Sequence, residues 1–158
     1  ADPDPTDQGP EAGPDLDLHF RHSFAEDWFD QPFDCFWFNP HPNWGDWDPL
    51  VEDDPILTLD STDGSGPEQL LFDAPEEGAV YGVGVHVWSD HSFGPIEAQL
   101  TISVGGSLAY EATVTLANQE FWEVATFDGS TGQLEILVDE AGDPLIVSDY
   151  ANPFFADP

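Results

Sequence analysis

Residues 60–68 read Asp-Ser-Thr-Asp-Gly-Ser-Gly-Pro-Glu, and they separate two short apolar runs. Two glycines and a proline in so short a stretch favour a tight turn over the interior of a helix or a strand. Asp60, Asp63 and Glu68 place three carboxylates in this turn, where they repel one another unless a cation neutralises them. Calcium prefers such acidic side chains together with loop carbonyls, although the spacing is not that of an EF-hand. A solvated acidic turn between two strands is the alternative.

Strand patterns lie on both sides of this turn. Residues 15–22 alternate between apolar and polar side chains, which is typical of a half-buried strand. Residues 23–45 are rich in aromatic side chains broken by prolines, which indicates one short strand between packed loops. Further strands are expected at residues 56–59, 70–72, 79–88, 97–104, 108–116, 119–127 and 133–138. Short strands at such regular spacing predict an all-β fold, an antiparallel β-sandwich that is jelly-roll-like.

The chain length suits one domain with a sizeable core. Residues 1–14 are proline, glycine and acidic residues without apolar periodicity, and we expect an extended acidic arm. Residues 15–138 form the predicted sandwich, and residues 139–158 form a C-terminal tail. Two apolar islands in this tail, residues 145–147 and 154–155, are interpreted as segments that dock on a neighbouring subunit.

The charge balance is one-sided. There are 33 acidic residues against one basic residue, Arg21, which gives a net charge of -32. Salt bridges therefore cannot hold the fold together, and salt, bound cations or low pH must offset the self-repulsion. Hydrophobic residues make up 40% of the chain, which is too apolar for a disordered acidic tail. The charge excludes nucleic acid as a direct partner, and no apolar run is long enough for membrane insertion.

Several features indicate a secreted protein. Methionine is absent and the chain begins at Ala1, which is expected of a mature terminus after removal of a signal peptide.

Cys35 is the only cysteine, so an internal disulfide is excluded, and its aromatic neighbours predict a buried, inert thiol.

Three motifs carry a resemblance to a known family. They are Asp15-Leu-Asp-Leu-His19, Thr62-Asp-Gly-Ser-Gly-Pro-Glu68, and Tyr81-Gly-Val-Gly-Val-His-Val87 with Gly94-Pro95. In this order they resemble the YfaP-like β-sandwich domains of secreted bacterial proteins. The chain is also distantly similar to the calcium-binding domains that follow the catalytic domain of bacterial secreted peptidases. The resemblance covers about residues 15–127, and it implies a secreted accessory module without catalysis of its own. It does not specify a ligand.

The metal prediction extends from the turn to the first strand. Asp15 and Asp17 project from one face of that strand, about 7 Å apart. If the turn lies beside them, four or five carboxylate oxygens converge, and carbonyls and water complete a calcium site. The expected ligands are Asp15, Asp17, Asp60, Asp63 and Glu68. A second, weaker cluster consists of Asp46, Asp48, Asp53 and Asp54. The alternatives are a polar outer face for the first set and an exposed acidic loop for the second.

The histidines give no recognisable metal motif. His86 and His91 flank Trp88 and Asp90, but no His-Glu-X-X-His sequence exists, so ordinary hydrogen-bonded roles are expected. No Gly-X-Ser-X-Gly sequence exists either, and we expect no enzyme.

The tryptophans offer a second type of site. Trp44, Trp47 and Trp88 are candidates for an exposed platform that stacks on sugar rings, with core and loop packing as the alternative.

Together these observations favour a secreted calcium-binding β-sandwich with a structural role. We expect it to bind copies of itself and to assemble into an extracellular fibre, tube or lattice, with bridging calcium offsetting the charge. A carbohydrate-binding accessory module is the first alternative. A halophilic acidic domain without specific ion sites is the second.

Overall fold

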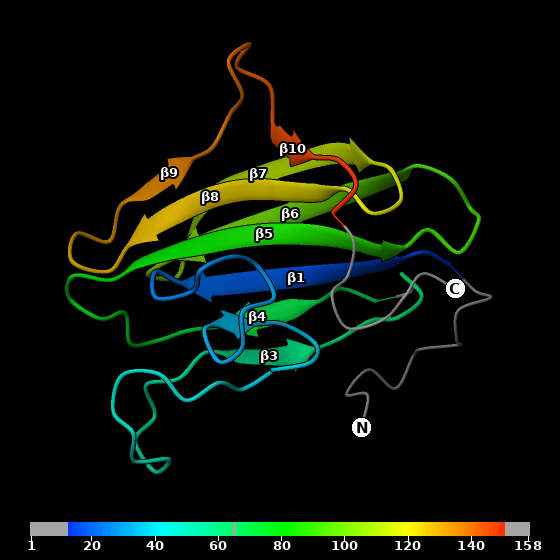
Figure 1. Ribbon diagram of the computed structural model, residues 1–158. Helices are drawn as coiled ribbons and strands as arrows, with labels where there is room; N and C mark the ends of the chain where they lie inside the picture. Colours follow the sequence, from blue (N-terminus) through cyan, green and yellow to red (C-terminus); the bar gives the residue numbers. More distant parts are fainter. Residues whose placement is uncertain (1–12, 65, 151–158) are drawn as a thin grey trace.

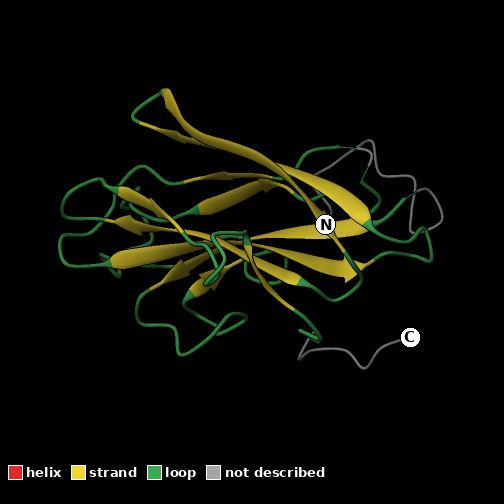
Figure 2. Ribbon diagram, turned by 90° about the horizontal axis from the view of Figure 1, so that it is seen from above, coloured by secondary structure: helices red, strands yellow, loops and turns green. Residues whose placement is uncertain are grey.

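The computed structural model describes residues 13–64 and 66–150, in which the chain forms ten antiparallel strands (Figure 1). The strands are β1 (Asp15–His22), β2 (Asp34–Cys35), β3 (Ile56–Leu59), β4 (Gln69–Leu71), β5 (Val80–Ser89), β6 (Ile96–Val104), β7 (Ser107–Leu116), β8 (Phe121–Asp128), β9 (Leu134–Ile136) and β10 (Leu145–Val147). Figure 2 shows strands and loops but no helix within this part of the chain. The predicted all-β class is confirmed. The described residues therefore include no helix long and apolar enough to cross a bilayer.

Six strands form the main sheet, in the order β10-β8-β5-β1-β2, and β9 also pairs with β8. β9 pairs with residues 125–127 and β10 with residues 121–123, so they follow one another along the same edge of β8. The tail segment 145–147 therefore forms a strand of the main sheet of the same chain and does not dock on a neighbouring subunit. The predicted domain boundary at residue 138 lies too early. The second tail island, residues 154–155, lies outside the described residues.

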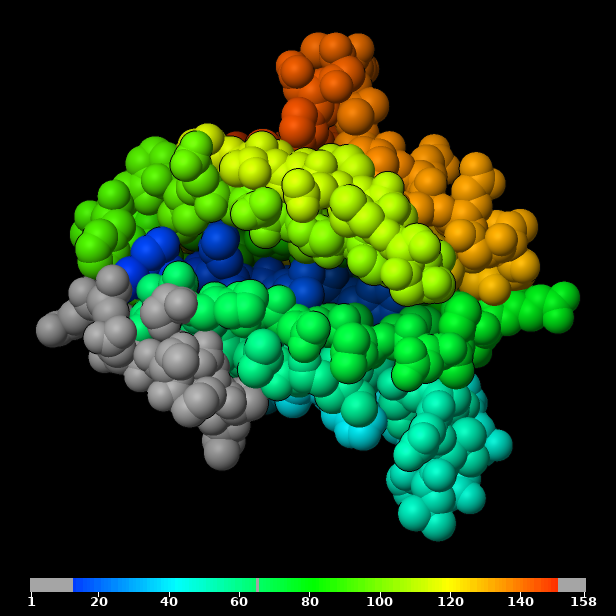
Figure 3. All heavy atoms as spheres, turned by 180° about the vertical axis from the view of Figure 1, so that it is seen from behind, coloured from blue at the N-terminus to red at the C-terminus, as the bar shows by residue number. Residues whose placement is uncertain are grey.

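Two hairpins, β3–β4 and β6–β7, cover one face of the main sheet, which gives a layered, sandwich-like arrangement. Leu16, Leu18 and Phe20 of β1 point towards this layer, as the alternation predicts. The largest fully buried side chains of the core include Trp122 and Tyr81. Seen from behind in Figure 3, the molecule is hollowed between the two hairpins, and β1 is visible at the bottom of the hollow.

The opposite face of the main sheet, here called the outer face, carries Asp15, Asp17 and His19 of β1. This face is buried as well: the three side chains are 7%, 3% and 0% exposed. The rings of Trp28, Phe29, Phe36 and Phe121 form a second apolar cluster over it, with Tyr150 packed against them. The aromatic segment 23–45, predicted as packed loops, thus covers most of this polar face. The polar outer face, the alternative to a metal site, is therefore covered and not open to solvent at these three side chains.

Candidate metal centre

Three of the five expected calcium ligands come together. Asp17 on β1, Asp60 after β3 and Glu68 before β4 each offer a carboxylate oxygen, and these oxygens lie within 4.8 Å of one another. Glu68 is fixed at this position by backbone amides. Its Oε2 accepts a hydrogen bond from the Leu18 N–H at 2.5 Å, and its Oε1 accepts one from Ser61 at 3.4 Å. We call Asp17, Asp60 and Glu68 the acidic cluster.

The turn folds against β1 because of its glycines. Gly64 has φ of 66°, in the left-handed region that favours glycine, and a Cβ there would meet the Pro14 carbonyl oxygen at 2.9 Å. The N–H of Gly66 donates to Ser61 Oγ at 3.3 Å. Residues 60–64 and 66–68 thus belong to a connection between β3 and β4 that is longer than the tight turn expected, and its close approach to the residues before β1 brings Glu68 to the β1 edge.

Three charged carboxylates so close to one another in the acidic cluster are electrostatically unfavourable. Burial raises the pKa of Glu68 well above its ordinary value, and the neighbouring charges of Asp17 and Asp60 raise this pKa further. Arg21, the only Arg or Lys side chain, lies elsewhere: its Nη1 is 3.8 Å from Asp27 and its guanidinium stacks over Trp28. A bound cation would remove this repulsion.

The other two expected ligands are near in sequence but not in this cluster. Asp15 and Asp63 are both buried, at 7% and 2% exposed. Within residues 13–64 and 66–150, neither joins the group of oxygens within 4.8 Å. A register shift in the β1–β5 pairing between Asp15 and Leu16 interrupts the regular alternation at the start of β1.

The second predicted metal cluster does not converge within the described residues. Asp46, Asp48, Asp53 and Asp54 do not bring three ligand atoms together. Their carboxylates instead accept backbone hydrogen bonds of the loop: Asp53 from Asp46 N at 2.7 Å, and Asp54 from Trp44 N at 2.5 Å. Asp46 and Asp48 each accept from the amide two residues later. This is the usual turn chemistry of aspartate.

A histidine pair, which the sequence motifs do not indicate, also converges on Asp17. One ligand atom each of Asp17, His19 and His86 lies within 4.8 Å of the other two, and all three side chains are buried. The strand pattern places Asp17 and His19 on one face of β1. The pairing of β1 with β5 that adds His86 is a long-range contact, and no local spacing reveals it. We call Asp17, His19 and His86 the histidine cluster.

The remaining histidines have ordinary roles, as expected. His91 Nδ1 lies 2.5 Å from the Gly13 carbonyl oxygen, and His22 Nε2 lies 3.2 Å from Glu76. The His41 side chain is 57% exposed.

The expected sugar platform is not formed by the three tryptophans. Trp44 is only 4% exposed, because it packs with Phe20 and Tyr81 in the core, and its Nε1–H donates to the Pro32 carbonyl. Trp88 packs edge-on against Trp37 at 4.9 Å, whereas Trp47 is 77% exposed. A row that requires Trp44 at the surface is therefore wrong.

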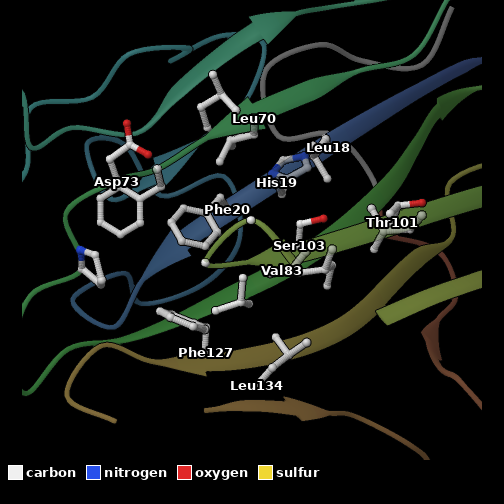
Figure 4. A pocket seen from close by; sticks show the side chains of 18 residues that line it. Leu18, His19, Phe20, Leu70, Asp73, Val83, Thr101, Ser103, Phe127 and Leu134 are labelled. Carbon is white, nitrogen blue, oxygen red and sulfur yellow. The ribbon is translucent and has the colours of Figure 1, made fainter. Parts of the chain in front are cut away.

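An apolar groove of about 560 Å³ separates the two hairpins (Figure 4). β4 and β6 form its walls, and Phe20, Val83 and Phe127 line its floor. Across the described residues, β4 is hydrogen-bonded only to β3, and β6 only to β7. Each wall strand therefore keeps one edge without a strand partner.

No protein-family model, curated protein or solved structure matches this chain. The resemblance to YfaP-like domains stays a prediction, and the functional argument rests on the geometry of the described residues.

Proposed function

We propose that this protein is a calcium-binding, all-β protein with a structural role outside the cell. The observation that carries the proposal is the acidic cluster, in which carboxylates of Asp17, Asp60 and Glu68 meet within 4.8 Å. Calcium takes six to eight oxygen ligands, so three carboxylates, loop carbonyls and water suit it. Asp15 and Asp63 lie close in sequence to these ligands and are candidates for the next shell. An extracellular setting fits a site of this kind, because calcium modules there work at high calcium concentration.

The raised pKa of Glu68 supports this proposal. Three acidic side chains gathered at one edge of a strand cost free energy unless they share a proton or a cation. A divalent ion can interact with all three carboxylates at once, as calcium does in acidic loops. A halophilic domain without specific sites would not require the three carboxylates to converge.

Calcium titration of the full chain tests the proposal. Isothermal titration and thermal unfolding are run with calcium, and with potassium at equal ionic strength. Calcium in large excess over its Kd should stabilise the protein by about 3 kcal/mol, because it binds the folded state. Glu68→Gln and Asp60→Asn should remove most of this gain. Glu97→Gln, which changes an exposed glutamate on β6, is the matched control. Equal melting temperatures in both salts would contradict a specific calcium site and favour the halophilic alternative.

Self-assembly is the second candidate, and the groove between β4 and β6 is the observation that favours it. Unpaired strand edges around an apolar floor suit the addition of an extended segment. The occupant we propose is residues 151–158 of a neighbouring copy, which carry Phe154 and Phe155. Tyr150, from which this segment continues, packs on the outer face against Phe121, on the far side of the main sheet from the groove. A head-to-tail contact of this kind would propagate into a fibre or lattice.

Light scattering and electron microscopy in millimolar calcium test assembly. Deleting residues 151–158, or introducing Leu71→Asp at the groove wall, should keep the protein monomeric. Leu108→Asp is the control, because it changes another exposed leucine, on β7 and outside the groove lining. If the intact chain stays monomeric at high concentration, assembly is wrong while the calcium proposal is unaffected.

A further inference from the structure

Three buried polar atoms without a hydrogen-bond partner converge on the outer face of the main sheet. Within the described chain, these atoms are Asp17 Oδ2, His19 Nε2 and His86 Nδ1. The side chains are 3%, 0% and 0% exposed, so bulk water does not reach them. Leaving a buried polar atom without a partner costs the free energy of its lost hydration. One ligand atom of each of these residues lies within 4.8 Å of the other two, and His86 Nδ1 is 3.9 Å from Asp17 Oδ2, which is too long for a hydrogen bond. This convergence of unpartnered atoms indicates a shared ligand.

The register of β1 and β5 produces this convergence. Asp17 lies directly opposite His86, and His19 lies opposite Gly84, two residues further along the same face of β1. A Cβ at Gly84 would collide with the Phe121 ring, so only glycine lets this ring pack over the cluster. The rings of Phe29, Phe36 and Phe121 lie 4.7, 4.9 and 5.3 Å from the His19 ring. Phe29 and Phe121 also lie 5.2 and 5.8 Å from the His86 ring, so aromatic rings surround both histidines.

The hydrogen bond at one ring nitrogen of His86 determines which nitrogen carries the lone pair. His86 Nε2 lies 2.7 Å from the Tyr150 carbonyl oxygen. A carbonyl can only accept, so Nε2 carries the proton. In the neutral imidazole, Nδ1 is then unprotonated and free to bind a cation.

His19 is oriented in the same way by a carboxylate. Its Nδ1 lies 2.7 Å from Asp34 Oδ2, which also accepts a hydrogen bond from Phe29 N at 2.7 Å. Asp34 is completely buried. With the Nδ1 proton held by Asp34, the lone pair of His19 is on Nε2. A histidine that binds a metal usually donates its other ring N–H to a carboxylate or a carbonyl, and that acceptor is the outer shell of the site.

We propose that Asp17, His19 and His86 bind a divalent transition-metal ion of the zinc class, with Asp34 and the Tyr150 carbonyl as the outer shell. Two imidazole nitrogens and one carboxylate oxygen are a ligand set that zinc takes in proteins. Calcium prefers oxygen ligands, so this site differs in chemistry from the acidic cluster. Asp17 belongs to both clusters, and a carboxylate with two oxygens can contact an ion on each side. The inference does not depend on calcium binding.

A trapped water molecule is the competing occupant, because it could satisfy the same three atoms by hydrogen bonds. The first experiment separates the two. The full chain, stripped of metal with a chelator, is titrated with zinc in saturating calcium, and bound metal is counted after desalting. One zinc per chain is expected. No bound zinc at micromolar free concentrations would mean a water site only, and would overturn the proposal.

Two conservative substitutions test the ligands while keeping the outer shell. His19→Asn retains an amide donor near the Nδ1 position and removes Nε2. His86→Gln retains a donor near the Nε2 position and removes Nδ1. Each should weaken zinc binding by more than the roughly 10- to 100-fold that loss of an outer-shell partner costs. His41→Gln, at an exposed histidine, is the matched control and should leave the affinity unchanged. Unchanged affinity in folded His19→Asn and His86→Gln would overturn the proposal.

A measurement on the unchanged protein remains decisive if these variants do not fold. Zinc should shift the nitrogen resonances of His19 Nε2 and His86 Nδ1, and cobalt(II) bound in its place should show absorption bands of a site with nitrogen ligands. Shifts confined to His22, His41 or His91 would overturn the assignment. Glu68→Gln separates the two proposals, because it should abolish calcium binding and leave the zinc stoichiometry at one.

Discussion

His19 Nδ1 lies 2.7 Å from Asp34 Oδ2, and both side chains are completely buried. Asp34 stands on β2, at the edge of the main sheet, and the same oxygen accepts the Phe29 amide. One carboxylate therefore holds a β1 side chain and the loop that covers it. A protein with almost no basic residues fixes its interior with hydrogen bonds of this kind, because ion pairs with lysine or arginine are not available.

The first prediction is that Asp34→Ala strongly destabilises the protein. The substitution leaves His19 Nδ1 and the Phe29 N–H without their buried acceptor, and breaking such a pair costs about 3–5 kcal/mol. Urea unfolding measures the change in midpoint. Asp143→Ala, at an exposed aspartate between β9 and β10, should cost less than about 1 kcal/mol. Equal effects of the two substitutions would show that Asp34 is not a structural anchor.

The second prediction concerns Gly84. Because a methyl group there collides with Phe121 and approaches Trp28 Cη2 at 3.1 Å, Gly84→Ala should destabilise the fold by about 1–3 kcal/mol. Thr113→Ala, on the exposed side of β7, should stay within about 0.5 kcal/mol of the unchanged protein. Thermal and urea unfolding provide the comparison. A neutral Gly84→Ala would mean that the Phe121 ring moves aside freely.

The third prediction separates the two contacts made by Tyr150. Its hydroxyl donates to Asp27 Oδ1 at 2.7 Å, and its ring packs 5.0 Å from the Phe121 ring. Tyr150→Phe removes only the hydrogen bond and should cost about 1 kcal/mol. Tyr150→Ala also removes the ring and should cost clearly more, as measured by urea unfolding. If the two variants were equally stable, the ring would contribute nothing to the cover of the outer face.

Much of the fold could be predicted because strands leave a local signature. The alternation in residues 15–22 predicts β1 with its observed bounds, and Gly105-Gly106 marks the β6–β7 hairpin. β10 was missed because residues 145–147 are only a short apolar island between polar residues. Their strand conformation comes from pairing with β8, which is a tertiary contact.

The candidate site was predictable only in part, for a related reason. The turn at residues 60–68 identifies Asp60 and Glu68, because glycine, proline and acidic residues announce a loop with close carboxylates. The partnership of His19 with His86 depends on strand pairing across a long stretch of chain. Burial also cannot be inferred from polarity alone: Asp17 and His19 resemble an exposed strand face until the aromatic segment after β1 covers them.

The last prediction is the pH dependence of the calcium-free protein, and its sign follows from Glu68. Burial, together with Asp17 and Asp60, raises the pKa of folded Glu68 above its unfolded value of about 4.3. Between these two pKa values the folded state binds more protons than the unfolded state, so the free energy of unfolding falls as pH rises. The contribution of Glu68 is thus complete below the unfolded pKa and is lost as pH rises through the folded pKa. Urea unfolding in chelator across this range measures it. Glu68→Gln serves as the reference because carboxylates outside the acidic cluster contribute equally to both proteins, so the difference reports Glu68 with its neighbours Asp17 and Asp60. The free energy of unfolding of the unchanged protein, minus that of the variant, should fall as pH rises. Calcium should bind more tightly as Glu68 loses its proton. A difference that rises with pH would mean that Glu68 is stabilised as a carboxylate without any cation, and the electrostatic argument for the calcium site would be wrong.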